Sequence, residues 1–508
     1  MKWFVRIVLG AVVLLALALG ALLYFVPVSV PLPGMLANWF PRLFSAPHAD
    51  VAVVRSRLRV PPGYGLSLFA ADVKGARMVR VTAAGDLLVA SQDLGAVLIF
   101  AKDKDGDGRA DGRRTLLEHL DGPNGLDFRD GYLYVAETGR VVRVRFDSAA
   151  GTVAGEPEVV IDNLPAGGNH WKKTIRFGPD GLLYLAIGSD CNVCIEQDER
   201  RAAMLRFTPD GKFVDIFATG LRNSAGFDWR DADGELYATD NGRDLLGDDF
   251  PPCELNRIRQ GGFYGWPFAN GDRVPDPDFG KGRDDVIRSS IPPVFSFRPH
   301  NAPLGIVFLR SPAQPPEYRG AAVVALHGSW NRSVKDGYKV VSLHWQPDGT
   351  IVSRDFLTGF LVGDDVIGRP AEVAEDKDGD IYVSDDYANA VYRVAPGAPA
   401  VASGATPVGE DASRAVGPPR VAAPVPKPAI SAAARTAGAA QFARLNCATC
   451  HAPASAPEAG KVVLDGLAGR YSSASLAGYL RRPREPMPPV TASEDDVRSL
   501  TEYLLATY

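Results

Sequence analysis

Histidine, methionine and cysteine are scarce in this sequence, and basic residues do not outnumber acidic ones. The 508 residues include seven His, five Met and five Cys, with 55 Lys and Arg against 60 Asp and Glu. A net charge of −5 gives no reason to expect a nucleic acid as partner. Hydrophobic residues make up 46% and charged residues 23%, as in an ordinary folded protein, and the length favours two or more domains.

Charge is absent from Ile7 to Val26, directly after Lys2 and Arg6. At about 1.5 Å per residue, a helix of this length covers the ~30 Å hydrocarbon core of a bilayer. No clear cleavage site follows, and no nearby Cys could carry a lipid anchor. We therefore expect residues 1–30 to form a single-pass transmembrane helix in the inner (cytoplasmic) membrane, with the rest of the chain facing the periplasm. A long cleaved signal peptide is the alternative, and it also exports the remainder.

Glycine and proline are plentiful in the rest of the chain, and a turn with Gly recurs before alternating apolar residues. An Asp-Gly turn in this position is a strong hairpin signal. Six copies, one of them degenerate, follow at spacings of roughly 46 to 59 residues with one longer interval. They begin at Ala84, Asp130, Asp180, Asp233, Arg319 and Asp378. The pattern predicts a mostly β chain, with a six-bladed β-propeller over 50–395 and large loops around 243–315. A two-sheet sandwich does not explain this pitch.

Residues 396–433 contain eight Pro, many Ala and no aromatic residue. Such a segment cannot bury enough apolar area to fold, so we expect an extended linker. Residues 434–508 then form a second, small all-α domain, because the segments before and after its central motif have helical patterns.

The second domain contains Cys447-Ala448-Thr449-Cys450-His451, the C-x-x-C-H signature of covalent haem attachment. Two thiols bond to the haem vinyl groups and His451 ligates the iron. Met487, within Met-Pro-Pro, is the only Met after residue 204 and is the expected second axial ligand. A zinc or redox C-x-x-C is the alternative. The segment resembles small class I cytochromes c over its whole length, which implies haem c and electron transfer.

Cys191 and Cys194 form a second C-x-x-C without a following His. In an exported protein, a local disulfide is the simpler interpretation, and a redox-active disulfide is the alternative. Cys253 is then left as a buried thiol.

Several motifs of the propeller region occur in an order found in a known family. They are Gly168-Asn169-His170, Gly220-Leu221-Arg222-Asn223, Glu254-Leu255-Asn256, Tyr264-Gly265-Trp266-Pro267 and Gly328-Ser329-Trp330-Asn331. Over about residues 60–395 the chain resembles the glucose/sorbosone dehydrogenase family, and the last motif resembles its sorbosone-like branch. The resemblance implies a six-bladed, calcium-dependent quinoprotein that uses pyrroloquinoline quinone (PQQ).

The resemblance also implies catalytic residues. His170 matches the family's general base, which takes the hydroxyl proton while hydride passes to the quinone. An Asp supports that base in the family; Ser189 stands in its place here, and Asp190 follows one residue later. Asp190 is therefore the candidate partner of His170. A histidine hydrogen-bonded within the core is the alternative for His170.

The quinone-binding residues that the resemblance implies come from three blades. Arg222 and Asn223 match the pair that binds the tricarboxylate quinone, where a bidentate Arg–carboxylate contact is expected. Arg369 matches a second quinone-binding arginine. His327 lies near the position of a quinone-contacting lysine in the fifth blade.

Calcium is implied at two places by the resemblance. Gly242 and Arg243 match backbone carbonyls that hold calcium against the quinone, and Glu254 and Tyr264 match a second, structural calcium. A separate acidic loop has the early ligand positions of a calcium loop but lacks its terminal Glu, and a solvated acidic turn is the alternative. Its candidate ligands are Asp103, Asp105, Asp107 and Asp111.

Together these features predict a membrane-anchored dehydrogenase that oxidises an aldose or related sugar aldehyde or hydroxyl with PQQ. Electrons would pass to its own haem and then to a respiratory oxidase or a soluble cytochrome. A calcium-dependent lactone hydrolase is one rival, since six-bladed propellers also host that chemistry, but it has no use for a haem. A non-catalytic sugar- or protein-binding propeller is the other.

Overall fold

The computed structural model describes residues 49–397 and, further on, 428, 430–453, 462–464, 467, 473–481, 483 and 487–508. The chain divides into two compact units, Met1–Pro418 and Pro419–Tyr508. The expected membrane helix and most of the expected linker lie outside the described residues. Within the described part, every helix is too short or too polar to cross a bilayer.

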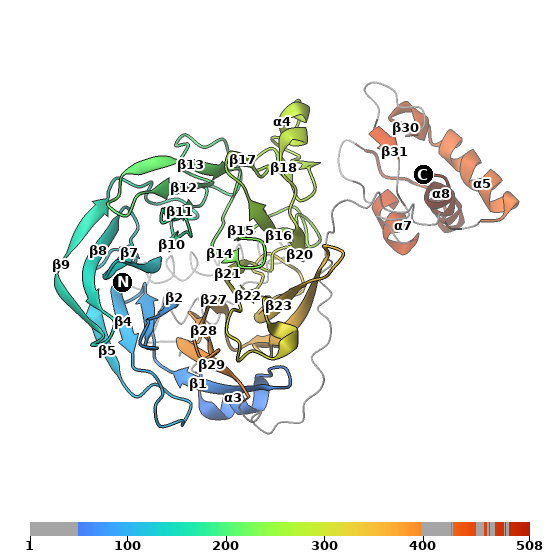
Figure 1. Cartoon of the computed structure of the whole chain (residues 1–508). Coiled ribbons are helices and arrows are strands. Elements are labelled where there is room, and N and C mark those ends of the chain that lie inside the picture. Colours follow the sequence, from blue (N-terminus) through green and yellow to red (C-terminus); the bar gives the residue numbers. More distant parts are fainter. Residues whose placement is uncertain are drawn as a thin grey trace, which may run out of the picture. The chain divides into compact units, whose positions relative to one another are not determined.

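The first unit is a six-bladed β-propeller, as the repeat predicts (Figure 1). Blades 1 to 3 are successive antiparallel sheets. Blade 1 comprises β2 (Ala76–Val81), β3 (Leu87–Ser91), β4 (Ala96–Phe100) and β5 (Arg113–Leu117). Blade 2 comprises β6 (Leu126–Arg129), β7 (Tyr132–Ala136), β8 (Val141–Asp147) and β9 (Thr152–Ile161). Blade 3 comprises β10 (Lys173–Phe177), β11 (Leu183–Ile187), β12 (Ala203–Phe207) and β13 (Phe213–Thr219).

Blades 4 to 6 complete the ring. Blade 4 comprises β14 (Phe227–Arg230), β15 (Glu235–Asp240), β16 (Cys253–Ile258) and β20 (Phe295–Phe297). Blade 5 comprises β21 (Pro303–Phe308), β22 (Ala322–Leu326), β23 (Lys339–Trp345) and β24 (Ile351–Leu357). Blade 6 comprises β27 (Pro370–Glu375), β28 (Ile381–Asp385), β29 (Ala390–Pro396) and β1 (Tyr64–Ala70). Each repeated turn leads into the second strand of its blade, and Gly131 and Gly181 adopt the positive φ that these turns require.

The long interval between the fourth and fifth copies holds small elements inserted within blade 4, as expected for 243–315. They are β17 (Gly262–Phe263), which extends blade 3 in parallel with β13, the hairpin of β18 (Ala269–Asn270) and β19 (Val274–Pro275), and α4 (Asp284–Ser289). Blade 5 contains one further short element and is followed by a short hairpin. They are η1 (Pro316–Tyr318), between β21 and β22, and the hairpin of β25 (Leu361–Val362) and β26 (Asp365–Val366).

The ring is closed by a strand that the repeat does not predict. β1 follows the short helix α3 (Val51–Arg57) and pairs antiparallel with β29, so the outer strand of blade 6 comes from the start of the propeller. This pairing covers an edge that would otherwise expose unpaired backbone groups. Buried apolar clusters fill each of the six junctions between neighbouring blades, as with Leu88 and Val97 of blade 1 against Leu133 and Val142 of blade 2.

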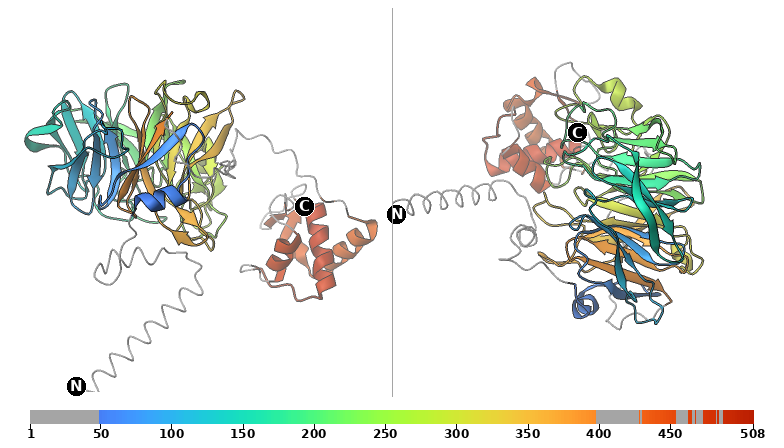
Figure 2. Two further views of the ribbon diagram at one scale, coloured as in Figure 1. Left: turned by 90° about the horizontal axis from the view of Figure 1, so that it is seen from below. Right: turned by 90° about the vertical axis from the view of Figure 1, so that its left-hand side faces the viewer.

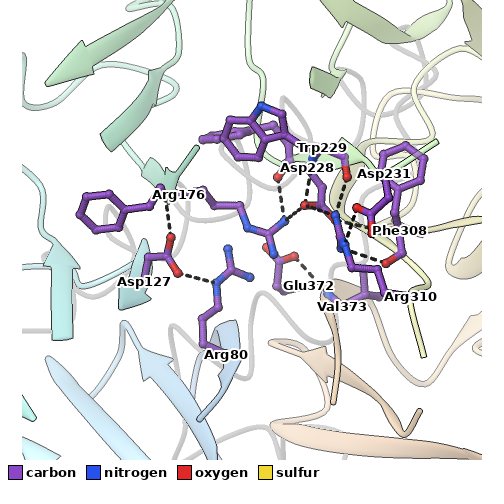
Figure 3. Close-up of polar contacts among 12 residues, drawn as sticks. Arg80, Asp127, Arg176, Asp228, Trp229, Asp231, Phe308, Arg310, Glu372 and Val373 are labelled. Atoms are coloured by element: carbon purple, nitrogen blue, oxygen red, sulfur yellow. Dashed lines mark hydrogen bonds and ion pairs between the residues drawn. The ribbon is translucent and has the colours of Figure 1, made fainter. Parts of the chain in front are cut away.

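Charged side chains meet where the first strands of the blades face the axis (Figure 3). Equivalent positions of blades 1 to 4 carry alternating charge, namely Arg80, Asp127, Arg176 and Asp228. Arg176 contacts Asp228 at 3.0 Å, and Arg310 contacts the same carboxylate at 2.9 Å. Although burial opposes ionisation, the two arginines hold the pKa of Asp228 below its ordinary value. We call Arg80, Asp127, Arg176, Asp228, Arg310 and Glu372 the axial charge group.

The second unit is mainly helical in its described part, and a short parallel pair of strands departs from the all-α domain expected from its sequence (Figure 2). It contains α5 (Ala432–Arg444), η2 (Cys447–Thr449), β30 (His451–Pro453), β31 (Val462–Leu464), α7 (Ser473–Arg481) and α8 (Glu494–Thr507). Helices α5 and α8 cross at Gly438, where an added Cβ would lie 2.2 Å from that of Tyr503. Only glycine allows this close approach.

Asp228→Asn should destabilise the propeller strongly, because it removes the buried carboxylate that pairs with both Arg176 and Arg310. Breaking a buried ion pair from one side costs about 3–5 kcal/mol. Glu158→Gln is the matched control, since Glu158 pairs with Arg143 but is 53% exposed, and should cost less than about 1 kcal/mol. Urea denaturation of the full-length variants measures both, and equal midpoints would contradict the importance of the axial charge group.

Candidate active site at the propeller axis

A cavity of about 180 Å³ opens at the axis and is lined from all six blades. Glu372 of the axial charge group is part of its wall, so the cavity ends at these buried charges. Its other lining residues are Arg77, Met78, Asn124, Asn169, His170, Trp171, Lys172, Thr174, Asn223, Ala225, Leu304 and Ala371. The position at the axis and the polar lining make this the candidate active site.

His170 lies in the cavity wall on the loop before β10. The backbone N–H of His170 donates to the carbonyl of Ser189, and the Cβ of His170 packs against Gly188, where an added Cβ would lie 2.4 Å from it. Nδ1 of His170 lies 3.1 Å from the carbonyl oxygen of Ser189 and 2.8 Å from its hydroxyl. A carbonyl oxygen can only accept, so Nδ1 carries the proton and Nε2 carries the free electron pair.

The expected contact between Asp190 and His170 is replaced by one with Ser189. The side chain of Asp190 is 57% exposed and lies 4.0 Å from Arg201. Burial, with Arg222 nearby, lowers the pKa of His170 to about 3. Because its partner is a neutral hydroxyl rather than a carboxylate, the imidazole is neutral at physiological pH and can accept a proton at Nε2.

Arg222 is not directed at the cavity as the resemblance implies. Its five N–H donors bond to groups of the chain itself, at 2.9–3.0 Å. The acceptors are the carbonyl and side-chain oxygens of Asn192, the carbonyls of Asn241 and Gly242, and the carboxylate of Asp244. A quinone carboxylate could bind Arg222 only by displacing one of these. Asn223, the second member of the pair, does line the cavity.

Cationic groups gather on the other side of the cavity. Arg77 and His327 both contact Asp386, the latter at 2.8 Å through Nε2. Burial opposes ionisation of Asp386, but His327 and Arg77 hold its pKa well below the ordinary value. Arg369 donates to the carbonyls of His327 and Gly328 at 3.0 and 3.1 Å. Burial and then Arg369 lower the pKa of His327 to about 3, so the cations of this group are Arg77 and Arg369. Of these, Arg77 lines the cavity, whose wall also includes the carboxylate of Glu372.

Lys172 completes this cationic wall. Its amine lies over the ring of Trp171, 5.7 Å from the centroid, and among the described residues no carboxylate comes within ion-pair distance of it. Burial and then Arg77 lower the pKa of Lys172 to about 7. An anion in the cavity would favour its protonated form.

A second, smaller cavity of about 20 Å³ brings together all four residues that resemblance assigns to calcium. Gly242, Arg243, Glu254 and Tyr264 line it, together with Asp240. The two expected calcium sites therefore share one cavity. Arg243 is engaged by Asp276 at 2.8 Å, and the carbonyl of Gly242 accepts from Arg222.

The donor set of this cavity fits a hard cation. Asp240 and Glu254 are both buried, and burial raises the pKa of Asp240 to about 7 and that of Glu254 to about 8. The side-chain oxygen of Asn241, which lines the cavity, is buried without a hydrogen-bond partner in the described part of the chain. Asn256 lies outside the lining and donates to the carboxylate of Glu254. Calcium prefers such oxygen ligands and would remove the cost of two buried carboxylates.

In the acidic loop, carboxylate oxygens of Asp103, Asp105 and Asp111 lie within 4.8 Å of one another. Asp107 is not part of this group; its carboxylate accepts from the backbone N–H of Arg109. Asp103 is already paired with Arg393 at 2.8 Å. The loop therefore has less free negative charge than its sequence indicates.

All five cysteines and both candidate haem ligands are among the described residues. Cys191 and Cys194 form the expected disulfide, and Cys253 is a buried thiol. In the second unit, Cys447 and Cys450 are free thiols at η2, directly after α5. His451 follows in β30 with Nδ1 buried and unpartnered among the described residues. Met487 packs on the apolar cluster of α7 and α8.

Residues 132–393, from β7 into β29, match the sequence model of a family described as glucose/sorbosone dehydrogenase. The chain belongs to this family. An uncharacterised protein of Borreliella burgdorferi is 30% identical over 357 residues, which cover 67% of this chain and 91% of that protein. Family membership identifies the chain as an oxidoreductase of the sugar-dehydrogenase type.

Solved structures share the fold at low identity. The calcium structure of the Trichoderma reesei carbohydrate-active enzyme of family AA12 has a TM-score of 0.59 and 20% identity, covering 69% of this chain and 98% of that one. The holo form of the pyranose dehydrogenase PQQ domain from Coprinopsis cinerea has a TM-score of 0.58 and 19% identity, with the same coverage.

Several residues of the site were not found from the sequence. Arg77, Lys172, Glu372 and Asp386 belong to the axial cavity or its cationic wall, and Asp240 to the smaller cavity. Lys172 stands two residues after His170 and Asp240 two before Gly242, so proximity to predicted residues was an available signal. Arg77 and Asp386 come from opposite ends of the propeller sequence, and only the closed ring joins them.

Lys172 should react with acetic anhydride at neutral pH far more readily than an ordinary lysine. With a pKa near 7, half of its amine is neutral at pH 7, against roughly one in 2,500 for a lysine of pKa ~10.4. Peptide mass spectrometry of trace-labelled protein across pH 6–10 gives the midpoint of labelling independently of access. The exposed Lys281 is the internal control. If the labelling midpoint of Lys172 were as high as that of Lys281, the lowered pKa of Lys172 would be contradicted.

Proposed function

We propose that this protein is a quinoprotein dehydrogenase that oxidises an aldose or related sugar aldehyde or hydroxyl compound with PQQ. The observation that carries the proposal is the axial cavity, which is lined by a neutral His170 together with the basic side chains of Arg77 and Lys172. Membership of the glucose/sorbosone dehydrogenase family supports it. The fold shared with a PQQ-containing pyranose dehydrogenase domain agrees with it.

The residues of the cavity fit a cofactor with three carboxylates. Arg77 and Lys172 are the cations of the wall nearest to His170 in the cavity lining, and Arg369 lies behind His327. Lys172 is suited to hold an anionic group, because its amine has no carboxylate partner among the described residues. Bound PQQ would supply a two-electron acceptor for hydride.

His170 would act as the general base. Nδ1–H is held by Ser189, so Nε2 can accept the hydroxyl proton of the substrate as hydride leaves carbon. The depressed pKa makes the imidazole a weak base in the empty cavity. Its pKa should rise once anionic carboxylates enter, because they offset the positive field of Arg222 and Arg201. Trp171 and Leu304 are apolar parts of the wall that can exclude water.

We further propose that calcium binds in the smaller cavity through Asp240 and Glu254, with Gly242, Arg243 and Tyr264 around it. Its support is the pair of buried carboxylates and the unpartnered amide oxygen of Asn241. Calcium at Asp103, Asp105 and Asp111 is a weaker part of the proposal, since Arg393 already neutralises Asp103.

We also propose that the second unit carries a covalent haem c and receives the electrons. The support is the C-x-x-C-H motif at the end of α5, the crossing of α5 and α8 at Gly438, and a Met in the loop before α8. The sequence of residues 1–30 supports an anchor in the cytoplasmic membrane, with both units in the periplasm. Electrons would leave to a respiratory oxidase or a soluble cytochrome.

Full-length protein loaded with PQQ and calcium should reduce its own haem when mixed with an aldose or sugar aldehyde. Stopped-flow absorbance should give a rate constant independent of enzyme concentration, because donor and acceptor share one chain. His170→Ala should retain PQQ but slow this step roughly 10² to 10⁴-fold. His119→Asn, an exposed histidine elsewhere in the propeller, is the matched control. PQQ-loaded protein that oxidises none of a panel of such substrates would overturn the dehydrogenase proposal.

Calcium at about 100-fold its Kd should raise the unfolding temperature of chelator-treated protein by roughly 5 °C, because it binds only the folded propeller. Glu254→Gln should lose most of this shift, whereas Glu199→Gln, which changes an exposed carboxylate, should keep it. Differential scanning calorimetry with and without calcium measures both. An equal calcium shift in wild type and Glu254→Gln would show that calcium binds elsewhere.

A further inference from the structure

The disulfide between Cys191 and Cys194 closes a four-residue turn that lies between His170 and Arg222. We call residues 191–194 the disulfide turn. It follows β11 by way of Gly188, Ser189 and Asp190, and all four of its residues are only partly buried. Neither the family resemblance nor the proposed reaction gives it a role.

On one side, the disulfide turn holds Arg222 through Asn192. The main-chain carbonyl of Asn192 accepts from Nε of Arg222 and its side-chain oxygen accepts from Nη2, both at 2.9 Å. The same amide also donates to the carbonyl of Asp244 and accepts from the N–H of Asp244. Asn192 therefore fixes two of the five N–H donors of a guanidinium that is 4% exposed.

On the other side, the turn acts on His170 through Ser189. The hydroxyl of Ser189 donates to the carbonyl of Cys191 at 2.7 Å. Since a serine hydroxyl has one hydrogen, its oxygen can meet His170 only as an acceptor. The Cys191 carbonyl thus orients the Ser189 hydroxyl so that it receives the Nδ1–H of His170 at 2.8 Å. This contact adds to that of the Ser189 carbonyl, which lies 3.1 Å from the same nitrogen and precedes the disulfide turn by two residues.

We propose that the disulfide turn is a positioning element of the active site, which fixes the Nδ1–H tautomer of His170 through Ser189 and the guanidinium of Arg222 through Asn192. The part of this proposal that concerns catalysis rests on the proposed dehydrogenase function. The part that concerns the tautomer of His170 does not.

A disulfide can hold these contacts because both accepting carbonyls, those of Cys191 and Asn192, belong to the backbone of the turn. An open four-residue turn in contact with solvent would sample other backbone conformations, and a cross-link removes part of that freedom. Reduction should therefore leave the propeller folded, because the six junctions between blades do not depend on the turn, but should release both contacts.

Imidazole ¹⁵N NMR of full-length protein without PQQ tests the tautomer directly. The His170 signals are assigned by their loss in His170→Gln. We expect a single Nδ1–H tautomer in wild type, a mixture in Cys191→Ser/Cys194→Ser, and a mixture after mild reduction of wild type that reverses on reoxidation. Val193→Ala, in the same turn, should keep the wild-type signals. Reduction of wild type keeps the test valid should the double variant not fold.

A second variant replaces the neutral hydroxyl beside Nδ1 of His170 with a carboxylate. Arg222 and Arg201 are the charged groups that act on His170 from neighbouring elements, and the exposed Asp190 lies 4.0 Å from Arg201. Ser189→Asp adds a carboxylate at Nδ1, which stabilises the imidazolium, so the NMR titration midpoint of His170 should rise by roughly one pH unit or more. In PQQ-loaded enzyme, the acid limb of kcat/KM should move in the same direction, because only the neutral imidazole acts as base.

Kinetic measurements on the loaded enzyme distinguish a failure of this inference from a failure of the proposed function. In loaded enzyme, Cys191→Ser/Cys194→Ser should lower kcat roughly tenfold or more and Val193→Ala should not. An Nε2–H tautomer in wild type, or a single Nδ1–H tautomer that survives reduction, would overturn the inference even in an active dehydrogenase. Absence of turnover in every variant would instead count against the proposed function and leave the NMR result standing.

Discussion

Six first strands converge on the propeller axis, and each brings polar groups into a space from which water is largely excluded. The chain meets this constraint with opposite charges at equivalent positions, from Arg80 through Asp127 and Arg176 to Asp228 (Figure 3). Blades 5 and 6 carry Val307 and Ala374 at those positions, and Arg310 and Glu372 supply charge from nearby positions instead. Without this compensation each buried charge would be unpaired, at a cost of several kcal/mol. The cavity ends at this layer, so the depth of the site depends on it.

Blades 4 and 6 share one contact between a carboxylate and a backbone N–H. In blade 4, Asp240 at the end of β15 accepts from the backbone N–H of Arg222 at 3.0 Å. In blade 6, Asp385 at the end of β28 accepts from the backbone N–H of Arg369 at 2.9 Å. A carboxylate that ends the second strand thus fixes the loop that precedes the first strand of the same blade. Both loops carry an arginine, and the partners of the two guanidinium groups differ.

The sequence was sufficient for features that depend on local patterns. The six turns and their second strands, the disulfide of Cys191 and Cys194, and the helices α5 and α8 all follow from spacing over a few residues. Features that depend on distant residues were missed or misassigned. β1 has no turn that marks it as part of blade 6. The partners of Arg222 come from Asn192 and Asp244, which no spacing rule connects. Family resemblance matched the position of Arg222 but could not show that its donors were already engaged.

The pairing of β1 with β29 also bears on the order in which the chain can fold. β1 ends at Ala70 and β29 begins at Ala390, so more than 300 residues must be made before this contact can form. Until then β1 is an apolar strand without its partner, and the ring has an open edge that could pair with another chain. Contacts of such sequence separation form slowly, because loop-closure entropy precedes any gain. Blades 1 to 5 can assemble in order as they appear, but the axis is enclosed only by the final strand. The ring around the active-site cavity is therefore complete only once β29 has paired with β1.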